Sequence, residues 1–134
     1  MDTNGHESLL RDVSLPHAAL VYSIVGAAFE VLKEIGHGLH EKPYENALVV
    51  EFGLRNLALE QQRSLEIFYK GKPVGLFVPD LLVANAVVVD TKVIERITNA
   101  ERGQMMNYLR MTKLKVGVML NFHRPKVEWE RIVL

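Results

Sequence analysis

The sequence contains no cysteine among its 134 residues. A disulfide scaffold is therefore excluded, and so is a zinc site built from cysteine ligands. Net charge is absent as well, because 16 lysines and arginines balance 16 aspartates and glutamates. A protein that coats nucleic acid with its whole surface needs an excess of positive charge, so the balanced composition excludes that class too.

Long hydrophobic runs are also missing. The apolar stretches of the sequence fall well short of the roughly 20 residues that a membrane-spanning helix needs. Residues 1–17 are polar and carry acids as well as Arg11. They lack the basic start and the apolar stretch of a secretory signal. We therefore expect a cytoplasmic protein that makes no membrane contact.

The overall composition is that of an ordinary globular protein, with 49% hydrophobic and 24% charged residues. A chain of this length is expected to form one domain. Residues 1–13 mix glycine, asparagine and charged residues without any period, so we expect them to be a flexible lead-in. The single domain is then expected to span residues 14–134.

Hydrophobic periodicity predicts three helices and five strands. The first helix is expected to begin at Ser14 and to end at Gly36 or Gly38, because apolar residues recur there at a spacing of three or four. The other helices are predicted at 43–57 and 99–111, the last capped by Thr98 or Asn99. The strands are predicted at 59–69, 74–83, 86–94, 115–122 and 129–134. The order ααβββαββ indicates an α/β domain.

The balanced charge conceals an asymmetry along the chain. Residues 1–60 contain 4 basic and 9 acidic side chains, whereas residues 61–134 contain 12 basic and 7 acidic ones. The second half could therefore present a basic surface that suits nucleic acid. The alternative is that the acidic helices neutralise these cations in space, and the sequence alone does not decide between the two.

The most informative segment is the pair of apolar strands around the turn at residues 84–86. If Val83 faces Val87, then Asp80 lies directly across from Asp90, on the same face as Lys92. Two carboxylates opposed within a sheet rich in valine and leucine repel each other and are costly to bury. A divalent cation such as Mg²⁺ or Mn²⁺ would compensate them. The alternative is an ion pair between Asp90 and Lys92 at the surface, with Asp80 in water.

Three short motifs occur in a fixed order along the chain. The segment from Gly38 to Tyr44 matches the pattern Gly-x-x-Glu-x-x-Tyr, and it resembles the GxxExxY protein family. The hairpin resembles the PD-(D/E)XK motif of a superfamily of Mg²⁺-dependent nucleases, to which that family is assigned. Gln104 and Tyr108 are similar to a Gln-x-x-x-Tyr pattern in the following helix. Together the motifs are far more specific than any one of them.

The resemblance implies a central mixed β-sheet flanked by helices, the minimal core of a PD-(D/E)XK nuclease. It also implies roles for individual residues. Asp80 and Asp90 would be metal ligands, with the Thr91 carbonyl as a third, and Lys92 would be the catalytic lysine. Glu45 would be the helix acid that reaches the same metal or its water. Asp90 stands where the family usually has the longer glutamate.

Gln104 and Tyr108 lie one helical turn apart, so the resemblance implies that they line the cleft and contact the substrate or position the lysine. The function that follows is Mg²⁺- or Mn²⁺-dependent hydrolysis of phosphodiester bonds, with DNA favoured over RNA. The alternative is a catalytically weak or inactive nuclease fold that binds nucleic acid or a protein. Because no separate DNA-reading element is visible, a homodimer or a protein partner would supply sequence specificity.

Overall fold

The computed structural model describes residues 17–134, so the predicted lead-in at 1–13 and the predicted helix start at Ser14 lie outside the described residues. Helix α2 spans Ala18–Ile35. Its apolar stripe is buried as the spacing predicts, with Val21 and Ile24 fully inaccessible to solvent. The helix ends at Gly36, whose backbone φ of 74° is readily adopted by glycine.

Helix α3 spans Glu41–Leu54, so it begins and ends earlier than predicted. Pro43 lies within its first turn and not at its start. A proline is tolerated there because the first-turn N–H groups have no partner within the helix. The helix ends before Asn56, which has a left-handed φ of 58°. The predicted extension to residue 57 is therefore wrong.

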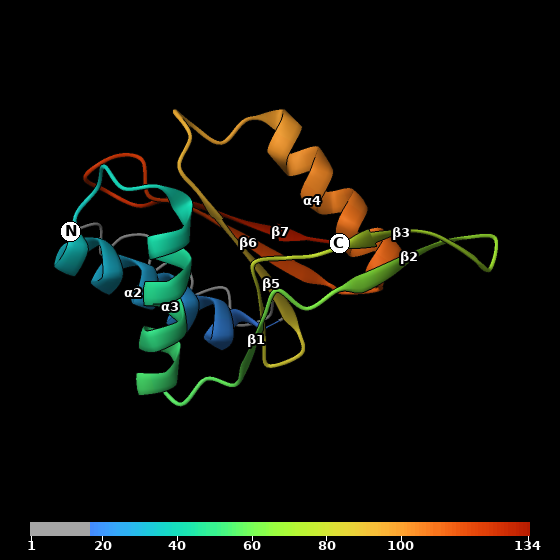
Figure 1. The fold of residues 1–134 in the computed structure, drawn as a ribbon, viewed down its shortest axis with the longest axis horizontal. Helices are drawn as coiled ribbons and strands as arrows, with labels where there is room; N and C mark the ends of the chain where they lie inside the picture. The colour runs from blue at the N-terminus through green and yellow to red at the C-terminus, as the bar shows by residue number, and fades with distance from the viewer. Residues whose placement is uncertain (1–16) are drawn as a thin grey trace.

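A five-stranded sheet forms the centre of the molecule, in the order β1-β4-β5-β6-β7 (Figure 1). Strands β5 and β6 are parallel and the other neighbours are antiparallel, so the sheet is mixed. The mixed sheet flanked by helices confirms the predicted fold class. The strands are β1 (Leu59–Gln61), β4 (Leu81–Val83), β5 (Val87–Lys92), β6 (Val116–Asn121) and β7 (Glu128–Val133).

Two predicted strands are each broken in the structure. The predicted strand 59–69 is interrupted at Gln62, which has a left-handed φ of 57°, and the chain continues as β2 (Leu65–Tyr69). The predicted strand 74–83 divides into β3 (Lys72–Phe77) and β4 around Pro79, which has no N–H to donate. Strands β2 and β3 pair with each other as a separate hairpin. The described part of the chain therefore reads ααβββββαββ.

Helix α4 spans Asn99–Thr112 and begins with a capping box, in which Thr98 and Glu101 bond each other's backbone. Helices α2 and α3 pack on one face of the sheet, while α4 and the β2–β3 hairpin cover the other (Figure 1). The larger apolar core lies under α2 and α3. The smaller one lies under α4, where Phe77, Leu82 and Met105 are buried.

Candidate functional site

The β4–β5 hairpin has the predicted register, because Val83 pairs with Val87 and Leu81 with Val89. Its turn is formed by Ala84 and Asn85, both with a φ of 53°, and the Ala86 N–H donates to the Val83 carbonyl at 3.0 Å. A pair of left-handed residues matches the twist of the strands that they join. The register places Asp80, just before β4, beside the end of β5.

Asp80 is held against β5 by two short hydrogen bonds. Its Oδ2 accepts the backbone N–H of Thr91 at 2.8 Å and the Thr91 hydroxyl at 2.7 Å. Thr91 is 2% exposed, so these bonds lie in a largely water-free environment where they orient the carboxylate firmly. One oxygen of Asp80 is thus used to fix its direction.

Asp90 lies next to Asp80 and is also mostly withdrawn from water, with 17% of its side chain exposed. Burial, together with the negative charge of Asp80, raises the pKa of Asp90 to about 6. Lys92 opposes this increase, and its Nζ lies 3.9 Å from Asp90 Oδ2. The predicted placement of Asp90 and Lys92 on one face is confirmed. Lys92 alone does not fully compensate the two acids.

The acid that reaches this cluster from helix α3 is Glu41. Its negative charge is a further cause of the raised pKa of Asp90, and its Oε1 accepts the Val93 N–H at a long 3.4 Å. Tyr44 positions this end of the helix, since its hydroxyl donates to the Gly36 carbonyl at 2.7 Å and its ring stacks on Phe122 at 4.6 Å. The sequence motif therefore has a structural role at the site.

Glu45, expected as the helix acid, is 3% exposed and is bonded to other partners. Its Oε2 accepts from Gln61 at 2.7 Å, from Gln62 at 3.0 Å and from Lys42 at 3.0 Å. Burial disfavours its charge, but these three bonds outweigh burial and hold the pKa of Glu45 below its ordinary value. The backbone N–H of Gln62 in turn donates to the Asp80 carbonyl at 3.0 Å, which links Glu45 to the site indirectly.

Gln104 and Tyr108 lie one turn apart on α4, as predicted, and the Gln104 amide approaches the Tyr108 hydroxyl at 3.4 Å. The Tyr108 ring stacks on Phe77 at 3.8 Å. The beginning of α4 faces Lys92. The Thr98 N–H holds the pKa of Glu101 below its ordinary value, and the positive charge of Lys92 contributes to the same effect. Gln104 and Tyr108 therefore lie on the same side of the sheet as Lys92.

Sequence reasoning missed a buried polar residue, Asn121, which pairs with Lys92 across β5 and β6. Its amide donates to the Ile94 carbonyl at 2.8 Å and to Glu128 at 2.9 Å, and its oxygen accepts the Ile94 N–H at 3.1 Å. Glu128 also accepts the Ile97 N–H at 3.1 Å. These bonds fix the loop that leaves Lys92 toward α4. The available signal was an asparagine at the end of an otherwise apolar strand.

The site offers several oxygen atoms that could bind a divalent cation. Residues 17–134 contain no group of three or more His, Asp or Glu side chains placed to hold a metal ion by themselves. Two carboxylates, the adjacent Thr91 backbone and the Glu41 carboxylate are nevertheless hard oxygen donors of the kind that Mg²⁺ prefers, with water completing the shell. Burial and the charge of Asp80 raise the pKa of Asp90, and a bound cation would oppose both effects. The residues present fit such an ion.

Comparisons with known proteins agree with this fold. The chain is similar to the solved protein titled "Crystal structure of SSO0001", with 19% identity and a TM-score of 0.52, which shows a common fold. The similarity covers 94% of this chain, and the chain spans 61% of that structure's length. No curated protein matches the chain.

Within residues 17–134, no helix is both long and apolar enough to cross a membrane.

The family model described as "PD-(D/E)XK nuclease superfamily" matches residues 18–132, which include both helices of the α2–α3 layer, the hairpin acids and α4. Nucleases of this kind generally use divalent metal ions. With the mixed sheet and the Asp80, Asp90 and Lys92 cluster in place, the chain belongs to the PD-(D/E)XK nuclease superfamily.

Proposed function

We propose that this protein is a Mg²⁺- or Mn²⁺-dependent nuclease that hydrolyses phosphodiester bonds in DNA in preference to RNA. The observation that carries the proposal is the convergence of Asp80, Asp90 and Lys92 at the end of the β4–β5 hairpin. The preference for DNA rests on the family resemblance. We also propose membership of the GxxExxY family, a cytoplasmic location and a single domain over residues 14–134.

The roles of the hairpin residues follow from their contacts. Asp80 and Asp90, with the Thr91 carbonyl, would hold the cation, and Thr91 also orients Asp80. When bound, the cation would polarise the scissile phosphate and lower the pKa of an attacking water. Lys92, a positive group on the same face, orients that water and stabilises the negative charge that develops on the phosphate.

The helix acids have separate roles in this proposal. Glu41, whose charge reaches Asp90, completes the acidic cluster. Glu45, which the resemblance places at the metal or its water, is here a positioning residue that acts through Gln62 on the Asp80 backbone. Gln104 and Tyr108 shape the substrate side of the cleft from α4.

The test is cleavage of plasmid and of single-stranded DNA by the purified protein in millimolar Mn²⁺. Lys92→Ala is expected to lower the rate by at least about 100-fold, since general acid–base or electrostatic groups contribute roughly that much. Lys33→Ala, an exposed cation on α2 and on the opposite face of the sheet, is the matched control. Equal cleavage by the Lys92→Ala protein would overturn the proposal.

A second candidate function is a nuclease fold without efficient catalysis that binds nucleic acid or a protein partner. Two observations favour it. Within residues 17–134 the acids do not form a complete metal-holding group by themselves, and one Asp80 oxygen is already occupied by Thr91. A protein that binds DNA in Mn²⁺ without cleaving it would support this candidate. A homodimer or a protein partner would then supply sequence specificity.

A further inference from the structure

The β2–β3 hairpin buries only one of its two faces. Leu65, Ile67 and Phe77 pack toward α4. The other face is bare, with Phe68 49%, Val74 61% and Leu76 61% exposed. Tyr69, next to the turn, is 62% exposed, and Lys70 Nζ lies 5.4 Å from the centre of its ring. A contiguous exposed apolar face rimmed by polar residues is typical of a binding site.

The hairpin and the end of α4 carry an excess of positive charge. Residues 65–77 and 105–115, which form the hairpin and the end of α4, contain five basic side chains and one acidic side chain. The basic residues are Lys70, Lys72, Arg110, Lys113 and Lys115. None of the five takes part in an ion pair found within residues 17–134. We call this region the hairpin surface.

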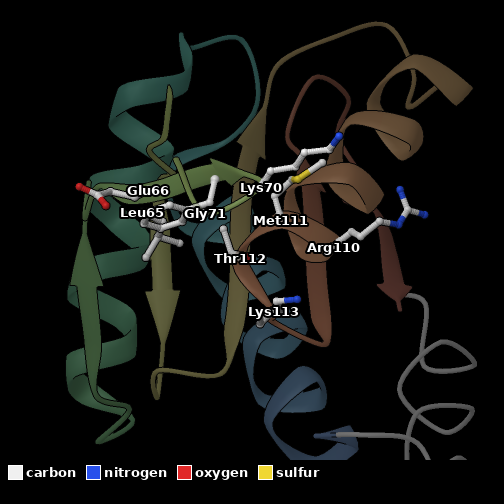
Figure 2. A pocket seen from close by; sticks show the side chains of 9 residues that line it. Leu65, Glu66, Lys70, Gly71, Arg110, Met111, Thr112 and Lys113 are labelled. Carbon is white, nitrogen blue, oxygen red and sulfur yellow. The ribbon is translucent and has the colours of Figure 1, made fainter. Parts of the chain in front are cut away.

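A pocket of about 400 Å³ lies where the hairpin meets the end of α4. Lys70, Arg110 and Lys113 line it together with Phe68 and Met111. Figure 2 shows that the one acid of this region, Glu66, points to the opposite side from Arg110. The lining of the pocket therefore has three cationic residues and one acidic residue beside apolar side chains.

We propose that the hairpin surface binds single-stranded nucleic acid, with a base stacked on Phe68 and phosphates held by Lys70, Arg110 and Lys113. The inference rests on the proposed function, because it supplies the substrate-binding surface of that nuclease. Aromatic side chains beside unpaired cations are the combination that sequence-tolerant single-strand binding uses. In a duplex the bases are stacked on each other and cannot cover exposed rings.

The charge selects this occupant over a second copy of the chain. A second copy of the chain docked on the same face would bring two surfaces of excess positive charge together, which is unfavourable. The hairpin packs on the α4 face of the sheet, which also carries Asp90 and Lys92. The pocket lies at the end of α4 and Lys92 faces its beginning, so a bound strand would run along this 14-residue helix, about 20 Å, to reach the proposed catalytic residues.

The experiment is fluorescence anisotropy of a labelled oligothymidylate of about 15 to 20 nucleotides, a length that covers one or more typical single-strand sites. EDTA is present so that no cleavage occurs. The double variant Lys70→Glu/Lys113→Glu is expected to bind about tenfold or more weakly and with a shallower salt dependence. Phe68→Ala is expected to bind at least about fivefold more weakly with the salt slope unchanged. Lys33→Glu on α2 is the matched control.

Equal affinity of the parent and both variants would overturn the inference. So would concentration-dependent dimerisation that Phe68→Ala abolishes, because a second copy would then be the occupant. Cleavage by the parent protein in Mn²⁺, measured beside binding, separates this inference from the proposed function. If the hairpin variants lose binding but the parent never cleaves DNA, the nuclease proposal fails and the binding surface stands. If the parent cleaves DNA but the hairpin variants bind as it does, the nuclease proposal stands and this inference fails.

Discussion

The two faces of the central sheet differ sharply in what they bury. Toward α2 and α3, strand β5 presents Val87 and Val89, which belong to the larger apolar core, and then the buried Thr91. Toward α4 the same strand presents Val88, then Asp90 and Lys92. Because alternation assigns successive residues to opposite faces, one strand contributes to the apolar core on one side and presents the proposed catalytic residues on the other. The following predictions test this division.

The largest expected effect lies on the α2–α3 side. Phe122 is fully buried and stacks on Tyr44, so Phe122→Ala should lower the free energy of unfolding by about 3–5 kcal/mol. Val50→Ala, at a position 65% exposed, should change it by less than about 0.5 kcal/mol. Urea denaturation measures both. A small loss for Phe122→Ala would show that this layer is not the main source of stability.

On the α4 side, the buried charge of Asp90 should lower the free energy of unfolding. The pKa of Asp90, about 6, lies above its unfolded value, so the folded state binds more protons between about pH 4 and 6. The free energy of unfolding should therefore fall as pH rises through that window. Without metal at pH 7, Asp90→Asn should be more stable than the parent by up to about 3 kcal/mol. Thermal melts in EDTA across this pH range would contradict the prediction if both proteins gave parallel curves.

Asn121 tests whether the end of β5 needs its polar support. Asn121→Ala leaves the Ile94 amide and carbonyl without their partner and should cost about 1–3 kcal/mol. It should also lower kcat more than it raises KM, because the loop after Lys92 loses its fixed position. Lys33→Ala, at an exposed position of α2, is the control. An effect on stability alone, with normal kcat, would limit Asn121 to a structural role.

The smallest effect concerns the cation. Mn²⁺ at about ten times its dissociation constant should stabilise the protein by about 1.4 kcal/mol and raise its melting temperature. Asp80→Asn should remove this response, whereas Lys33→Ala should keep it. A melting curve that does not move in millimolar Mn²⁺ would count against the metal site and against the functional division of the two faces.

Local signals predicted some features well. The register of the β4–β5 hairpin followed from a short turn with Asn85 and from two apolar runs, since turn geometry and a period of two are local properties. The end of α2 at Gly36 and the cap of α4 at Thr98, each one of two residues expected there, have the same basis. Helix α3 and the strand breaks at Gln62 and Pro79 were predicted less accurately, because a strand pattern does not reveal when the chain leaves one sheet for another.

The sequence by itself determined the alternation that brings Asp80, Asp90 and Lys92 together. Only the tertiary structure decided which helix acid reaches them. Glu41 and Glu45 lie about one turn apart, and the docking angle of α3 directs Glu41 to Asp90 and Glu45 to Gln61 and Gln62. The tertiary structure also left the cations of the hairpin surface without acidic partners. Such pairings depend on contacts between distant segments, which local periodicity cannot specify.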